Sequence, residues 1–272
     1  MPEVALKDGG KLFYETHGTG EPVLFLNGIM MATRSWDDHV QALSGHIRLI
    51  LVDFRDQGRS SRLDRDYDLG LHVFDLVELL DALGLDRVHL MGLSYGGEVA
   101  TLFALEHADR LRSLILSNVP LRTSNYLAAL GDAWTAAAEL GDGDRFFKLA
   151  IPHVYSAHFY ERELEWLETR RRWFGRAATR EWFDGLVRLC KAAARYEMSP
   201  DRLRTIGVPT LLIGADEDLI APLRDLDVFR ESIPRCEMVV LRHAGHGAFQ
   251  ERCAELCTVL LGFVRKHGMQ SK

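Results

Sequence analysis

Short apolar segments alternate with helical stretches along most of the chain. The apolar segments are typical of buried strands. They cover residues 22–27, 47–53, 87–91, 111–117, 208–213 and 238–241, and residues 11–16 are typical of an early hairpin strand. Residues 73–83 carry apolar side chains at helical spacing, and we expect helices also over 95–107 and 248–266. This alternation predicts a parallel sheet covered by helices.

The alternation stops between residues 118 and 206, where the pattern is helical throughout. Breaks are expected near Gly141, Pro152 and Gly175. Four of the five tryptophans lie here, namely Trp134, Trp166, Trp173 and Trp182. We therefore expect a helical cap at 119–206, inserted after the sixth strand, between core segments 1–118 and 207–272. A single tryptophan most often fills a core, but this group favours an apolar substrate pocket under the cap.

The composition limits the partners and the location of the protein. The 272 residues carry a net charge of -6, with a pI near 6.0. This balance gives no electrostatic reason to expect nucleic acid or an anionic membrane as partner. The first residues do not resemble a signal peptide, and no apolar run approaches the roughly 18 residues of a membrane span. We expect a cytoplasmic protein that acts on a small molecule; the sequence leaves its oligomeric state open.

The four cysteines do not form a CxxC pair. They are Cys190, Cys236, Cys253 and Cys257, of which the last two lie four residues apart in the expected final helix. No histidine or second pair stands at the spacing of a zinc site. The sequence therefore indicates free, buried or half-buried thiols in a reducing compartment, and no metal site.

Gly92-Leu93-Ser94-Tyr95-Gly96 matches the motif G-x-S-x-G. It follows an apolar strand and precedes a helix, which is the context that the motif requires. In such a tight turn the serine takes a strained backbone conformation, and a Cβ at either flanking position would clash. The helix N-terminus supplies positive potential for a developing oxyanion. The motif predicts Ser94 as a nucleophile. We interpret Glu98, one turn later, as a first-turn carboxylate favoured by the helix dipole.

A serine hydroxyl needs an adjacent imidazole to take its proton. His246 lies in a glycine-flanked loop between the last strand and the last helix, which favours it over His243 at the strand end. His153 and His158, in the expected cap, are further candidates for the pocket lining.

The imidazole in turn needs a carboxylate that fixes its tautomer. Three acids, Asp216, Glu217 and Asp218, follow the strand at 208–213. Their place between serine and histidine fits the chain order expected for this fold. The residues alone do not choose among the three.

These motifs resemble those of the α/β-hydrolase superfamily, over essentially the whole chain outside the cap. The resemblance implies a mostly parallel, eight-stranded sheet flanked by helices. It implies Asp218 as the acid, because Asp218 lies four residues before Pro222, and Asp216 lacks that spacing. The family's histidine follows a glycine and precedes an acid, as His246 follows Gly245 and precedes Glu251.

The family's oxyanion loop usually contains His-Gly, and here it contains Asn27-Gly28. By position, the resemblance assigns the backbone N–H groups of Ile29 and Tyr95 to the oxyanion hole. Because the working groups are backbone N–H groups, Asn27 leaves the mechanism intact. Asn27, Met30 and Trp134 are the candidate substrate-binding residues.

Residues 53–60 resemble the family's D-x-R-G-x-G-x-S loop. Asp56 stands where the family has its first glycine. We interpret this loop as structural.

The serine nucleophile excludes the aspartate-dependent reactions of this superfamily. The expected reaction is hydrolysis of a carboxylic ester of a small or medium apolar substrate through an acyl-enzyme, with no metal or organic cofactor. A thioesterase, a lactonase, a C–C bond hydrolase and an acyltransferase use the same residues and remain alternatives. A small-molecule receptor on a hydrolase scaffold is an alternative of another class.

Overall fold

The computed structural model describes residues 2–268 and contains one sheet of eight strands. In chain order the strands are β1 (Glu3–Ala5), β2 (Lys11–His17), β3 (Pro22–Leu26), β4 (Arg48–Val52), β5 (Val88–Leu93), β6 (Leu111–Ser117), β7 (Thr210–Ala215) and β8 (Cys236–Leu241). Their order across the sheet is β1-β2-β4-β3-β5-β6-β7-β8. The β1–β2 and β2–β4 pairs are antiparallel and all other pairs are parallel. The predicted mostly parallel, eight-stranded sheet is confirmed.

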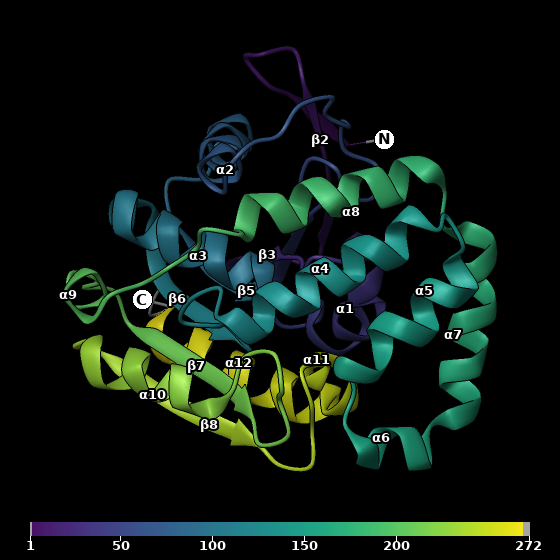
Figure 1. Cartoon of the computed structure of the whole chain (residues 1–272). Helices are drawn as coiled ribbons and strands as arrows, with labels where there is room; N and C mark the ends of the chain where they lie inside the picture. Colours follow the sequence, from purple (N-terminus) through teal and green to yellow (C-terminus); the bar gives the residue numbers. More distant parts are fainter. Residues whose placement is uncertain (1, 269–272) are drawn as a thin grey trace.

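Helices cover both faces of the sheet. Side chains alternate between the faces along each strand, so that Leu24 and Leu26 of β3 join one apolar core and Val23 and Phe25 join the other. The first core is covered by α2 (Gly70–Ala82), α3 (Tyr95–Glu106) and α10 (Leu223–Ser232). The second is covered by η1 (Thr33–Trp36), α1 (Asp37–Leu43), α11 (Ala248–Glu251) and α12 (Cys253–His267). Figure 1 shows this layered arrangement.

Apart from the short η2 (Ala108–Arg110), which directly precedes β6, the remaining helices lie between β6 and β7. They are α4 (Asn125–Glu139), α5 (Gly143–Ala150), η3 (Ile151–His153), α6 (Ala157–Arg162), α7 (Leu164–Ala177), α8 (Arg180–Ala193) and α9 (Pro200–Leu203). Figure 1 shows α4, α5, α7 and α8 gathered on one side of the molecule. Helices α4, α5 and α8 share an apolar core of their own, which includes Trp134 and Phe146. We propose that this insertion, at residues 119–206, is a cap domain.

Several predicted boundaries differ from the structure by a few residues, for example β7, expected at 208–213 and observed at Thr210–Ala215. The break expected near Gly175 lies slightly later, because α7 continues to Ala177 and the next helix begins after Thr179, whose side chain accepts the Trp182 N–H. The expected final helix is divided at Arg252 into α11 and α12. Within residues 2–268, no helix combines the length and the apolarity that crossing a membrane requires.

Candidate active site

Ser94 stands at the turn between β5 and α3, with φ 52° and ψ -115°. A non-glycine residue at positive φ stores backbone strain, which the surrounding structure must hold in place. The flanking glycines make this possible. A Cβ on Gly92 would collide with the carbonyl oxygen of Gly96, and a Cβ on Gly96 would lie 2.6 Å from the carbonyl oxygen of Leu26. The sequence therefore folds locally into the turn that the motif predicts.

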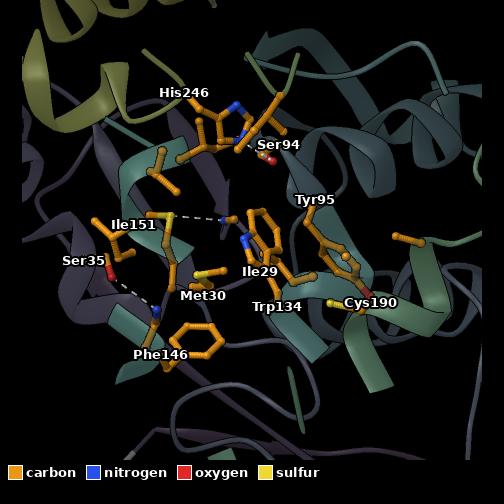
Figure 2. Close-up of a pocket in the computed structure, with 18 of the residues that line it drawn as sticks. Ile29, Met30, Ser35, Ser94, Tyr95, Trp134, Phe146, Ile151, Cys190 and His246 are labelled. Carbon is orange, nitrogen blue, oxygen red and sulfur yellow. Dashed lines mark hydrogen bonds between the residues drawn. The ribbon is translucent and has the colours of Figure 1, made fainter. Parts of the chain in front are cut away.

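A continuous chain of hydrogen bonds starts at the Ser94 hydroxyl. Ser94 Oγ lies 2.7 Å from His246 Nε2, and His246 Nδ1 lies 2.9 Å from Asp218 Oδ2. Figure 2 shows Ser94 and His246 side by side in the wall of a cavity. Asp218 Oδ1 accepts hydrogen bonds from the backbone N–H groups of Ile220 and Ala221, at 2.8 and 2.9 Å. These contacts fix the carboxylate, which in turn fixes the imidazole.

Asn118 supports this chain and was not found from the sequence. Its Nδ2 donates to Asp218 Oδ2 at 2.8 Å, and its Oδ1 accepts from the Ser117 hydroxyl at 2.9 Å. Asn118 is fully buried, with φ 49° directly after β6. Its position at the carboxyl end of a central strand was a signal in the sequence, but its partner is far along the chain.

The competing acids and the competing histidine form ion pairs outside the Ser94 hydrogen-bond chain. His243 has an exposed side chain that lies 3.8 Å from Glu217. Asp216 Oδ2 lies 3.5 Å from Nη1 of Arg242, the residue that follows β8. Among the described residues, none of these three forms a hydrogen bond or an ion pair with Ser94 or His246, so the geometry favours Asp218 and His246.

The loop that carries His246 is bonded to the insertion. The Glu251 carboxylate accepts from Gly245 N–H at 3.0 Å and from both the N–H and the hydroxyl of Ser156, at 3.1 and 2.5 Å. Gly247 N–H donates to the Val154 carbonyl oxygen at 2.7 Å. Burial raises the pKa of Glu251 above its ordinary value. The position of His246 thus depends on residues 154–156 of the insertion.

The two backbone N–H groups assigned to the oxyanion hole belong to residues that line the cavity beside Ser94. Tyr95 is the first residue of α3, so its N–H has no acceptor within the helix. Among the described residues, Ile29 N–H has no hydrogen-bond acceptor. Gln57 Nε2 holds the Ile29 loop by donating to the carbonyl oxygens of Gly28 and Ile29, at 2.9 and 3.2 Å. Both groups are therefore available to a ligand.

Asn27 lies beneath this loop rather than on the cavity. Its side chain is fully buried, donates to the Val52 carbonyl oxygen at 2.9 Å, and accepts from Trp36 Nε1 at 2.8 Å. All its polar atoms are used by the protein, so the structure gives Asn27 a supporting role in place of the expected substrate contact.

The cavity above Ser94 has a volume of about 690 Å³ and a mainly apolar lining. Met30 and Trp134, both expected to contact substrate, belong to this lining. Figure 2 shows Ser94 and His246 at one end of the drawn residues and Phe146 at the other. His153 and His158 are outside the lining, which corrects the expectation for those two residues. The volume falls in the range of about 300–1,000 Å³ typical of small-molecule sites.

Glu98 lies in surroundings that the sequence did not indicate. It is buried, lines the cavity, and its Oε2 has no hydrogen-bond partner among the described residues. Desolvation raises its pKa well above the ordinary value. Glu98 does lie in the first turn of α3, as expected, but its burial opposes the stabilisation that the helix dipole offers to a charged carboxylate. Trp134 Nε1 is likewise buried without a partner, so the cavity holds two unsatisfied polar groups.

Asp56, which replaces the family's glycine, adopts φ 67°. Its buried carboxylate forms two hydrogen bonds with the Arg188 guanidinium of α8, at 2.6 and 3.0 Å. Glycine adopts this positive φ without strain, but a glycine at position 56 could not form the ion pair with Arg188. Asp56 thus joins the core to the insertion, in keeping with the structural interpretation of this loop.

Comparisons with known proteins agree with this fold. A family model described as alpha/beta hydrolase fold matches residues 21–252. MGS-M2, an alpha/beta hydrolase enzyme from a Medee basin deep-sea metagenome library, is 30% identical, with a TM-score of 0.94 and full coverage of both chains. A thermophilic esterase from Thermogutta terrifontis is 27% identical, with a TM-score of 0.85 over 98% of this chain and 99% of the esterase. A protein of Caulobacter sp. (strain K31), whose name proposes a carbamate hydrolase (RutD), is 27% identical over 87% of this chain and 89% of its own.

Proposed function

The chain belongs to the alpha/beta hydrolase fold family, and from this premise we propose that it hydrolyses carboxylic esters of small or medium apolar substrates through an acyl-enzyme on Ser94. One observation carries the proposal. The hydrogen-bond chain from Ser94 through His246 to Asp218 opens onto an apolar cavity, beside backbone N–H groups that have no other acceptor.

In the proposed first step, Ser94 Oγ attacks the acyl carbon while His246 Nε2 takes the hydroxyl proton. The 2.7 Å separation lets the proton move without rearrangement of either side chain. Asp218 accepts the Nδ1–H of the imidazole and stabilises its positive form without becoming protonated itself. Asn118 keeps the carboxylate in this orientation.

The negative charge that develops on the acyl oxygen is stabilised by the N–H groups of Ile29 and Tyr95. One such donor contributes about 10²–10³-fold to kcat in serine hydrolases. The alcohol then leaves with the proton held by His246. In the second step His246 takes a proton from water, which attacks the acyl carbon. The imidazolium then returns this proton to Ser94 Oγ as the bond between Oγ and the acyl carbon breaks, which releases the acid and restores the Ser94 hydroxyl.

The cavity lining supports a substrate class. Apolar and aromatic side chains form most of it. Two of its buried polar groups, the Glu98 carboxyl and the Trp134 indole N–H, have no hydrogen-bond partner among the described residues. A buried polar group that gains a hydrogen bond from a ligand recovers its desolvation cost. We therefore expect an apolar substrate with one hydrogen-bonding group remote from the ester.

Replacement of the nucleophile tests the proposal. Ser94→Ala should lower kcat/KM for p-nitrophenyl esters by at least about 10⁴-fold, with unchanged circular dichroism and Tm. Ser35→Ala, which alters another cavity-lining serine, is the matched control and should retain activity. Ester hydrolysis that survives in Ser94→Ala refutes the role of Ser94.

The same assay separates the other reactions of this residue set. Thioesters, lactones, carbamates and vinylogous diketones are tested beside esters, and the highest kcat/KM identifies the bond. Tight ligand binding with negligible turnover on every substrate would instead favour the receptor.

A further inference from the structure

Three side chains that bind metals in other proteins meet on the face of the sheet covered by α1 and α12. His39 comes from α1, and Cys253 and Cys257 come from successive turns of α12. His39 Nε2 lies 3.7 Å from Cys253 Sγ, which lies 4.0 Å from Cys257 Sγ. All three atoms lie within 4.8 Å of one another. The cluster is separate from the Ser94 hydrogen-bond chain.

These separations are close to those of ligand atoms around one metal. Bonds of about 2.3 Å to sulfur and about 2.0 Å to nitrogen, at angles of about 109–120°, place neighbouring ligand atoms about 3.5–4.0 Å apart. The measured 3.7 and 4.0 Å fall in this range. An ion at the centre of the cluster therefore requires only small side-chain movements.

The protein holds the His39 ring rigidly but does not use it elsewhere. The ring is fully buried, stacks on Phe249 and contacts the edge of Trp36. Among the described residues, Cys253 is its only hydrogen-bond partner, and Nδ1 is buried without one. An imidazole with this burial and so few polar contacts costs stability unless a ligand compensates.

The surroundings suit a cation that arrives from solvent. Cys253 is only partly buried, whereas Cys257 and His39 lie beneath it, so entry passes the Cys253 sulfur. The exposed Asp38 carboxylate interacts electrostatically with both thiols and accepts a hydrogen bond from Gln250 at 3.3 Å. A negative group at the mouth of the site favours a positive occupant.

We propose that His39, Cys253 and Cys257 bind one thiophilic metal ion, Zn²⁺ or Cu⁺. Thiolate and imidazole ligands are those that both ions prefer over oxygen ligands. Three ligands complete a trigonal Cu⁺ site, whereas Zn²⁺ takes a fourth ligand from water or from Asp38 on the open side. Spacing along the sequence did not indicate a metal, because the nitrogen ligand is more than two hundred residues from the sulfurs.

Metal titration of the full-length, reduced and chelator-stripped chain tests the proposal. One arm uses Zn²⁺ and the other Cu⁺, each in competition with a chromophoric chelator, and Co²⁺ serves as a spectroscopic probe. We expect one equivalent to bind in at least one arm with Kd below about 1 µM, and a thiolate-to-cobalt charge-transfer band. The arm with the tighter binding identifies the ion.

Variants assign the ligands. Cys253→Ser and Cys257→Ser should each weaken the charge-transfer band of the cobalt form and weaken binding at least about tenfold, which is about 1.4 kcal/mol. His39→Gln should weaken binding and shift the cobalt ligand-field bands. Cys190→Ser and Cys236→Ser are the matched controls and should bind as the wild type does.

A thermal measurement covers the risk that a variant fails to fold. Bound metal should raise the Tm of the wild type, and Cys253→Ser should lose this rise while keeping its apo Tm and ester hydrolysis. Absence of saturable binding in all arms overturns the proposal. Equal weakening by the control substitutions overturns it too, and so does oxidation to a Cys253–Cys257 disulfide in a chain that binds neither ion.

Discussion

The carboxyl edge of the sheet and the helical insertion position their residues by different means. At the sheet edge the backbone decides. Ser94 is held by a strained turn that only glycines allow around it, and Asp218 is held by backbone N–H groups. In the insertion side chains decide, through helix caps such as Ser124 and Thr179 and through an aromatic core. A strained backbone position accepts few residue types, whereas a position held by side-chain packing tolerates many substitutions.

The difference assigns separate tasks to the two regions. The sheet edge supplies the proposed reactive groups at fixed distances, and the insertion supplies most of the cavity wall above them. Polar contacts that join the two regions include the Arg188–Asp56 ion pair, the Lys191–Asp66 ion pair and the bonds between Ser156 and Glu251. A change at the sheet edge should therefore affect the reaction, and a change in the insertion should affect stability and choice of substrate.

The largest effect is expected at the sheet edge. Asp218→Asn removes the carboxylate that fixes the imidazole tautomer, so kcat for p-nitrophenyl esters should fall by about 10⁴-fold. Asp216→Asn, two residues earlier in the same loop, should change kcat less than about twofold. Steady-state kinetics measure both, and similar losses in the two variants contradict the assignment of Asp218.

An intermediate effect is expected at the junction of the two regions. Arg188→Met leaves the Asp56 carboxylate buried without its partner, which should lower the free energy of unfolding by about 3–5 kcal/mol. Adding Asp56→Gly removes the orphaned charge and suits the positive φ, so the double variant should recover most of the loss. Urea unfolding measures both variants. If Arg188→Met has the same free energy of unfolding as the wild type, the Arg188–Asp56 ion pair does not stabilise the junction of the core and the insertion.

A smaller effect, which depends on pH, is expected where the cavity meets α3. The folded pKa of Glu98 is raised by burial, so its stabilising contribution is complete at low pH and is lost as the pH rises through that folded value. Glutamine stays neutral at every pH. The stability of Glu98→Gln relative to the wild type should therefore increase from about pH 4.5 upward, by up to about 1.4 kcal/mol per pH unit.

Urea unfolding at a series of pH values measures this slope. Glu106→Gln, at an exposed position of the same helix, is the matched control and should show no comparable trend. A stability difference for Glu98→Gln that is independent of pH is the result that excludes a neutral, buried carboxyl.

Local features of the chain were predictable from the sequence. The apolar segments predicted the strands, because their side chains face covered surfaces on both sides of the sheet. The turn at Ser94 was predictable because strand, glycines and helix are contiguous in the chain. The geometry of such a turn depends on a few consecutive residues, so a short sequence motif is enough to predict it.

Features that depend on distant parts of the chain were not predictable. Asn118 is recognisable as a support only when Asp218, one hundred residues away, lies beside it. Glu98 has the sequence context of a helix-start carboxylate, and its burial becomes visible only in the folded structure. The same holds for His39, which α12 brings beside two thiols. Asp216 and Asp218 are the same residue type in the same loop, and they differ in their spatial neighbours, which are Arg242 for Asp216 and Asn118 and His246 for Asp218.

The hydrogen bonds between the His246 loop and residues 154–156 bear on the order of events in a catalytic cycle. Gly247 and Gly245 reach this segment directly or through Glu251, and Val154 and Tyr155 also line the cavity. Any outward movement of this segment must stretch the bonds that keep the imidazole opposite Ser94. In the proposed mechanism, substrate loading by such a movement and proton transfer to His246 therefore belong to different moments.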